Sequence, residues 1–285
     1  VLQNKRNMQR KLNDFAVQSG FKSLLDFEGQ LNRKLGIKKD GRPNVKELTV
    51  NVIDKKTNQP TGRTKKVTLN ANNLLRVYAL SKNEIQKSKL ENMGITADVL
   101  AEIENELGPE LISFADKIVD YFSTDYFNEI NAVYKQANGI NLGFIENYFP
   151  TKTERSKVDG KLLENGDFNG IFSSETAPAF KERTDNFSPI LLKGAGFIDT
   201  MQNHVDTMET YKALAIPVQE LNQFFQIPAV DLLLDVTGMK KLLKTLVNAT
   251  VNPQSASSAA GVNVSGNFMQ KIANKFTGFA LAFKA

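Results

Sequence analysis

The side chains that most often carry acid–base and metal chemistry are scarce in this sequence. It contains no cysteine and a single histidine, His204, among 285 residues. Thiolate nucleophiles, disulfides and cysteine-ligated metal sites are therefore excluded, as are metal sites that need two histidines. A Ser–His–Asp triad would depend on His204 alone. Because His204 lies beside a helical stripe of apolar residues, we interpret it as a structural histidine on the flank of a helix.

The remaining candidates for chemistry are carboxylates and basic residues in the middle of the chain. Four carboxylates are of the type that binds magnesium: Glu146, Asp159, Glu164 and Asp167. Their spacing does not distinguish them from solvated loop residues. Lys181 and Arg183 could bind a phosphate or a carboxylate, but a surface ion pair with Glu182 is the ordinary explanation. The glycines of Lys193–Phe197 lack the spacing of a dinucleotide site, and no P-loop, kinase or hydrolase motif occurs. We therefore assign no catalytic, cofactor or metal site.

The net charge of +5 is unevenly distributed. Between Lys38 and Lys66, nine Lys and Arg residues stand against three acidic residues, whereas residues 82–129 hold eleven acidic residues and four lysines. Such an asymmetry fits a polyanionic partner, and it fits charge matching within the molecule or between subunits equally well. The candidate nucleic-acid contacts all lie in the basic part: Lys55, Lys56, Arg63, Lys65 and Lys66.

The elements that must position these residues are mainly helical, with one β-hairpin. Residues 1–35 have helical periodicity, whereas apolar and polar residues alternate on both sides of a turn-forming segment, which predicts a hairpin at about 46–70. Asn70 or Asn72 can cap the next helix, Pro109 can begin another, and Gly139 can end the helical region. Pro217 and Pro228 are each predicted to start a helix.

The predicted organisation has six parts. They are a helical segment with the basic hairpin (1–66), a helical unit (67–150), a long irregular connection (151–196), amphipathic helices (197–248), a linker (249–267) and a further helix (268–285). No segment is long and apolar enough to span a bilayer. Phe276, Phe279 and Phe283 continue an apolar face to the last residues, so we expect a piece of a longer polypeptide with a packing surface there.

The helical unit closes with Asn147-Tyr148-Phe149-Pro150. Pro150 disfavours helical geometry at Phe149, so the pattern predicts an aromatic anchor where the chain leaves the helices. Lys152, Arg155 and Lys157 follow, and with them the pair Tyr148–Phe149 could instead form a stacking platform for a base. We favour the anchor.

The order of these motifs resembles that in very large proteins of tailed bacteriophages. The similar region covers residues 67–216 and includes "VTLNANNLLRVYALSKNEIQ", "EINAVYKQANGINLGFIENYFPTKTER" and "FKERTDN". In the large polyvalent proteins and the related cargo proteins of crAss-like phages, a helical region leads to an Asn-Tyr-Phe/Val-Pro-like motif, here Asn147–Pro150. A Lys/Arg-x-Arg-Thr-like motif follows, here Lys181–Thr184, and then long amphipathic helices.

The resemblance implies a structural or cargo protein packaged inside the virion, in the capsid or tail lumen, and ejected through the tail into the host cytoplasm. The expected partners are portal, tail or other cargo proteins and phage DNA, with several copies per particle. Two alternatives stay open. The chain could be a module of a phage-delivered polymerase or nuclease, or a nucleic-acid-binding scaffold that uses the basic hairpin.

Overall fold

The computed structural model describes residues 2–34, 45–54, 57, 59–151, 190, 192 and 196–237. The chain divides into two compact units, Val1–Glu220 and Leu221–Ala285. The predicted irregular connection at 151–196 lies almost wholly outside the described residues, and the predicted linker and last helix lie entirely outside them. The finer segment boundaries drawn from the sequence stay predictions.

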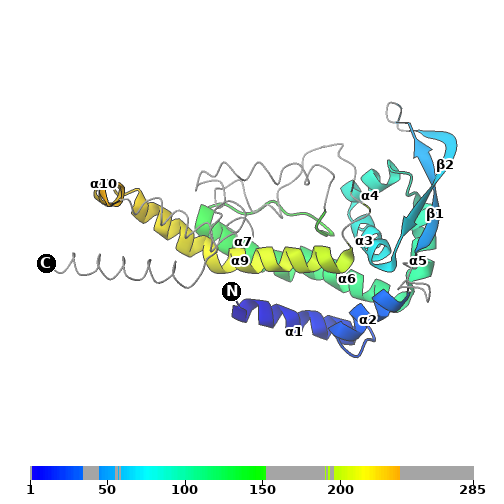
Figure 1. The fold of residues 1–285 in the computed structure, drawn as a ribbon, viewed down its shortest axis with the longest axis horizontal. Coiled ribbons are helices and arrows are strands. Elements are labelled where there is room, and N and C mark those ends of the chain that lie inside the picture. The colour runs from blue at the N-terminus through cyan, green and yellow to red at the C-terminus, as the bar shows by residue number, and fades with distance from the viewer. Residues whose placement is uncertain are drawn as a thin grey trace. The chain divides into compact units, whose positions relative to one another are not determined.

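Helices dominate the described part of the chain, and one antiparallel hairpin accompanies them, which confirms the predicted fold class (Figure 1). In chain order the elements are α1 (Leu2–Gln18), α2 (Leu24–Lys34), β1 (Lys46–Ile53), β2 (Pro60–Leu69), α3 (Ala71–Ser81), α4 (Glu84–Glu91), α5 (Ala97–Leu107), α6 (Pro109–Ser123), α7 (Asp125–Asn138), α9 (Phe197–Phe225) and α10 (Pro228–Val236). Among the described helices, none has the length and apolar character that a membrane crossing requires.

The hairpin forms because apolar residues alternate along β1. Leu48 and Val50 share one face of the strand and are 0% and 1% exposed. Val67 lies opposite Leu48 in the antiparallel register, and the register shifts between Asn51 and Ile53. The turn between α4 and α5 lies against β1 at this point. Gly94 has φ +88, and a Cβ there would overlap the carbonyl oxygen of Asn51, so glycine permits the close approach.

Local signals set several helix ends. Asn70 caps α3, its Oδ1 accepting from the N–H of Asn73 over 2.8 Å. Pro109 begins α6, and Gly139 ends α7 in the left-handed conformation, both as predicted. The prediction for Pro217 is wrong, because α9 continues through it. A proline within a helix removes one backbone donor, but the flanking residues can keep their own hydrogen bonds.

The core of the first unit is built around α3. Most residues of this helix are buried, and α3 packs against α2, α4, α5 and α6. Aromatic side chains join helices that are far apart in sequence. Phe27 of α2 lies 4.0 Å from Phe114 of α6 between ring centroids, and Phe114 lies 6.1 Å from Phe197 of α9. Asn72 adds a polar link, since its Oδ1 accepts from the N–H of Ile198 over 3.0 Å.

Candidate functional site

The segment that ends at Pro150 packs its aromatic residues into this core. Tyr148 and Phe149 are 8% and 2% exposed, and Pro150 is half-buried. The Phe149 ring stacks on Phe197, with centroids 4.9 Å apart and an interplanar angle of 14°. The N–H of Tyr148 donates to Ser123 Oγ over 2.7 Å. Buried rings offer no open face to a base, so this geometry is that of an anchor and differs from a stacking platform.

His204 lies among these rings, deeper than the helix flank expected from the sequence. The side chain is in the core, and its ring centroid is 4.9 Å from that of Phe122 and 5.5 Å from that of Tyr148. Burial lowers the pKa of His204 to about 3, so the imidazole is neutral near pH 7. A neutral histidine enclosed by aromatic rings has little access to a substrate, which supports its interpretation as a structural residue.

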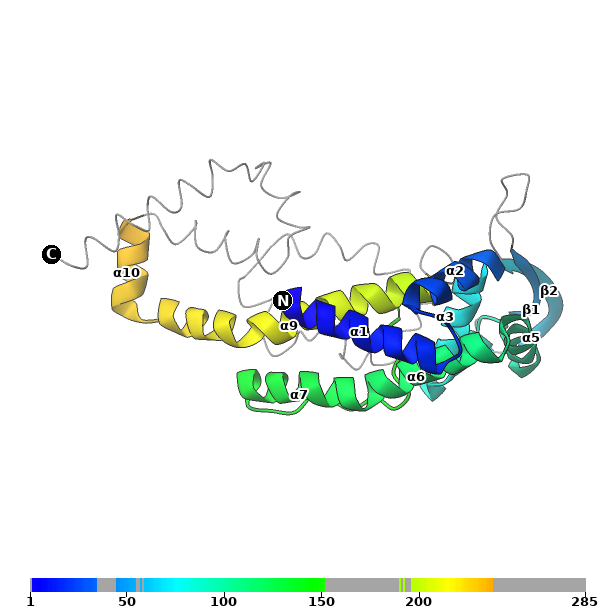
Figure 2. The same ribbon diagram turned by 90° about the horizontal axis from the view of Figure 1, so that it is seen from below.

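Helix α9 also buries a carboxylate that the sequence interpretation missed. Glu209 is 1% exposed, and its Oε1 lies 3.1 Å from Lys212 Nζ. The same ammonium lies 2.6 Å from Oε2 of Glu129 on α7, so the group ties α9 to α7 (Figure 2). A buried carboxylate is stable only with a fixed partner. The available signal was a Glu and a Lys three residues apart within an otherwise apolar stripe.

A second missed charge is Arg76, at the centre of α3. Its side chain is 1% exposed, and burial lowers its pKa to about 10, which still leaves the guanidinium charged near pH 7. An arginine inside the apolar run of α3 was the signal for it. Close by in sequence, Tyr78 Oη donates to Asp116 Oδ1 over 2.9 Å, and Lys82 Nζ lies 3.2 Å from the same oxygen. These contacts hold α3 against α6.

Three of the five candidate nucleic-acid residues are described by the structure, and all three lie on strand β2. Arg63, Lys65 and Lys66 are exposed, and Lys66 Nζ lies 2.7 Å from Glu47 Oε1 on β1. Within the part of the chain that the structure describes, no carboxylate forms an ion pair with Arg63 or Lys65. Both cations are thus available to a partner. Lys55 and Lys56 lie outside the described residues.

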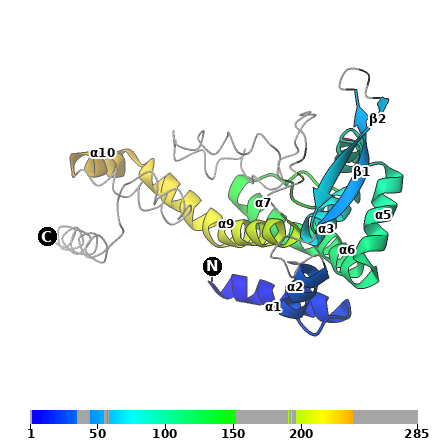
Figure 3. The same cartoon turned by 45° about the vertical axis from the view of Figure 1, so that its right-hand side comes forward.

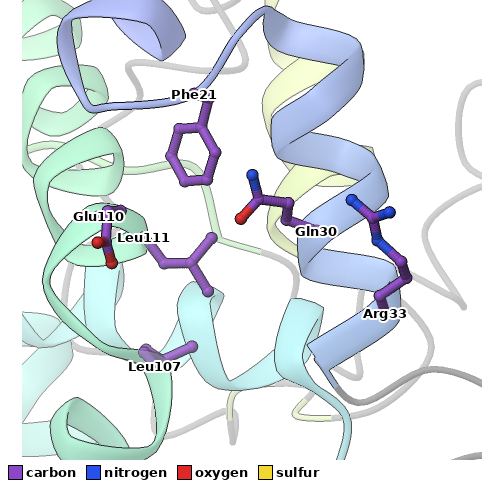
Figure 4. A pocket seen from close by; sticks show the side chains of 6 residues that line it. All are labelled: Phe21, Gln30, Arg33, Leu107, Glu110 and Leu111. Carbon is purple, nitrogen blue, oxygen red and sulfur yellow. The ribbon is translucent and has the colours of Figure 1, made fainter.

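An open cleft of about 400 Å³ lies between α2 and the start of α6 (Figure 4). Phe21, Leu107 and Leu111 supply apolar surface, whereas Gln30 and Arg33 of α2 and Glu110 of α6 supply polar groups. Arg33 is already engaged, since its Nε donates to the carbonyl of Gly29 over 3.2 Å and a terminal nitrogen lies 3.8 Å from Asp26. The cleft can hold an apolar side chain, and its described lining has no nucleophile paired with a base.

Several residues that the sequence analysis considered, as sites or as alternatives to them, lie outside the described residues, so the structure does not place them. They are Asp159, Glu164, Asp167, Lys181, Arg183, Phe276, Phe279 and Phe283. Glu146 is described and exposed, and its carbonyl accepts from Asn83 Nδ2 over 2.8 Å. In the described ranges, no three carboxylate or histidine side chains are grouped closely enough to hold a metal ion.

No protein-family model matches this sequence, no curated protein is similar to it, and no solved structure is similar to its fold.

Proposed function

We propose that this chain is a structural or cargo protein of a tailed-phage virion, and that it acts by packing against other virion proteins. The packing role is supported by the hairpin arm, defined as Asn51–Ile53 with Pro60–Lys66. Residues Pro60–Lys66 are exposed over seven consecutive positions, although the same strand is buried at Leu69. A two-stranded ribbon that extends beyond its core is marginal in water, and a partner surface would stabilise it.

The assignment to a virion is supported by the resemblance of residues 67–216 to phage cargo proteins. The chain has no cysteine, so no disulfide opposes unfolding during passage through a narrow tail tube. The core relies on aromatic packing and ion pairs, which can re-form after passage. We therefore propose that the protein lies in the capsid or tail lumen, beside portal, tail or other cargo proteins, and then enters the host cytoplasm.

Mass spectrometry of purified particles and of cells early in infection tests this proposal. Peptides of this chain are expected in the particles, and then inside cells in which new protein synthesis is blocked. Its absence from particles would contradict the virion role. Its presence in particles without transfer into cells would contradict ejection and leave a purely structural protein.

A nucleic-acid scaffold is the second candidate, because Arg63 and Lys65 are exposed and have no ion pair within the described residues. A basic ribbon can follow a phosphate backbone, and its affinity should fall steeply as salt rises. Fluorescence anisotropy with a labelled duplex would measure this binding in the full chain at several salt concentrations.

Two double variants, one in the hairpin arm and one on α1, each reverse two positive charges and serve as a matched pair. The Arg63→Glu/Lys65→Glu variant should lose duplex binding and reduce the salt slope, if the hairpin arm is the contact. The Arg6→Glu/Arg10→Glu variant makes the same change in net charge on α1, whose arginines are also exposed. Equal losses in both variants would show that binding follows net charge and would reject a dedicated site on the hairpin.

A further inference from the structure

Strand β2 offers a partner its side chains, while its backbone edge is protected. The strand carries Arg63, Lys65 and Lys66 and no carboxylate, and β1 is its only partner strand among the described residues. Pro60 has no N–H to donate, and lysines on an edge strand discourage the addition of another strand. The strand should therefore recognise a partner by the negative charge of the partner's side chains. The partner segment does not have to be a β-strand.

Helix α5 has the complementary composition. The helix contains no lysine or arginine. Four carboxylates occur along it: Asp98, Glu102, Glu104 and Glu106. Lys46 of β1 neutralises part of this charge, with Nζ 3.1 Å from Glu102 and 3.3 Å from Glu106. Asp98 and Glu104 are exposed, and no cation of the described residues pairs with either. The Lys46 contact demonstrates that this helix accepts a lysine from a β-strand.

The basic strand and the acidic helix lie at the same end of the first unit. Lys46 joins β1 to α5, and the hairpin stands beside α5 in two views (Figures 1 and 3). When complementary surfaces are neighbours, a two-fold rotation brings each one opposite its complement in a second copy, so both contacts form at once. A closed pair satisfies the exposed charges of both copies.

We infer that a second copy of this chain docks at the hairpin arm. The β2 strand of each copy lies against α5 of the other, with Arg63 and Lys65 facing Asp98 and Glu104. The inference deepens the packing role proposed above by naming the partner, and it rests on that role. Charge complementarity across the interface drives this association. It sets the register and the choice of partner, and salt weakens it.

Sedimentation velocity of the full chain over a concentration series tests the inference. The unsubstituted protein should form dimers in low salt, and these should dissociate at high salt. The Arg63→Glu/Lys65→Glu and Asp98→Lys/Glu104→Lys variants should each be monomeric, with the dimer dissociation constant raised about 10- to 100-fold. An equimolar mixture of the two variants should form dimers again, because opposite charges then meet at both contacts of the mixed pair. The Arg6→Glu/Arg10→Glu variant should dimerise normally.

Each result supports or overturns the inference. A monomeric unsubstituted chain at all concentrations would overturn it, and duplex binding by that monomer would assign the hairpin arm to nucleic acid. Dimers that survive both charge reversals would place the interface elsewhere. Circular dichroism and thermal unfolding of each variant show whether that variant is folded. The dimerisation measured for the unsubstituted chain does not depend on whether the variants fold. Particle mass spectrometry remains a separate measurement, so failure of dimerisation and failure of the virion proposal are distinguishable.

Discussion

The hairpin arm and helix α9 use the same residue types in opposite environments. Lys65 and Lys66 stand in solvent, whereas Lys212 lies between the buried carboxylate of Glu209 and the partly exposed carboxylate of Glu129. A charge in solvent adds little to folding and is free for recognition, whereas a buried charge constrains the fold. The position of a charge relative to the core thus separates a binding surface from a structural tie.

Aromatic residues extend this comparison to the segment that closes the helical unit. Phe149 is 2% exposed and stacks on Phe197, while Phe144, five residues earlier, is 63% exposed. Two phenylalanines of one short segment therefore have different tasks.

Replacing Phe149 by alanine should have the largest effect. The change leaves a cavity beside Phe197, and large-to-small replacements of buried aromatic residues cost about 4 kcal/mol in the free energy of unfolding. The Phe144→Ala change should cost less than about 1 kcal/mol, because most of that ring is already in water. Urea unfolding followed by far-UV circular dichroism measures both. Equal losses would mean that Phe149 does not anchor the segment.

Replacing Lys212 by methionine should cost about 3 kcal/mol, because the Glu209 carboxylate then stays buried without its cation. The Lys66→Met change in the hairpin removes an exposed pair with Glu47 and should cost less than about 1 kcal/mol. The same unfolding experiment applies. In the Lys212→Met/Glu209→Gln double variant, much of the lost stability should return, since no charge remains buried on α9. A double variant as unstable as Lys212→Met would contradict this explanation.

Two glycine replacements test the contact between the hairpin and the turn that joins α4 to α5. Gly94→Ala should cost about 2 kcal/mol, because the residue has φ +88 and the new methyl group meets the Asn51 backbone. Gly62 has φ +74, but nothing lies near its missing Cβ. Gly62→Ala should therefore cost only about 1 kcal/mol, from the backbone conformation alone. Thermal unfolding of both variants measures the difference. Equal shifts in the unfolding temperature would show that the contact of Gly94 with the Asn51 backbone contributes nothing beyond the backbone conformation.

The sequence predicted those features whose causes are local. The hairpin follows from the alternation around Leu48 and Val50, and the cap of α3 follows from the residue type at Asn70. Asn72 is of the same type, but it contacts the start of α9, and no local pattern could assign it to a residue 126 positions away. Pro217 was likewise mispredicted from its residue type, since α9 continues through it and Ile216 just before it packs against the core.

The buried groups were harder to predict because burial is decided by elements distant in sequence. His204 lies beside an apolar stripe, and the sequence could not show that Phe122 and Tyr148 would cover it from other segments. Glu209 is of a residue type usually found at the surface, and the sequence could not show that α9 would pack its carboxylate into the core. The exposed residues of β2 were easier, since Thr61–Lys66 is rich in lysine and threonine and has no apolar face to bury.

The smallest predicted effect is a pH dependence that belongs to His204. Its pKa in the folded protein is lowered to about 3 by burial, whereas an exposed histidine titrates near about 6.5. As pH falls below the higher value, the unfolded chain binds a proton that the folded chain does not, so stability is complete above that value and decreases below it.

Between about pH 7 and pH 5.5, this difference in proton binding should lower the free energy of unfolding by about 1 kcal/mol. The His204→Phe variant keeps an aromatic ring in the core but cannot bind the proton, so its stability should fall less over the same range. Urea unfolding of both proteins at the two pH values isolates the histidine, because they share every other titrating group. The same decrease in both would show that carboxylates cause the pH dependence, and that His204 is less enclosed by Phe122 and Tyr148 than its position in the core indicates.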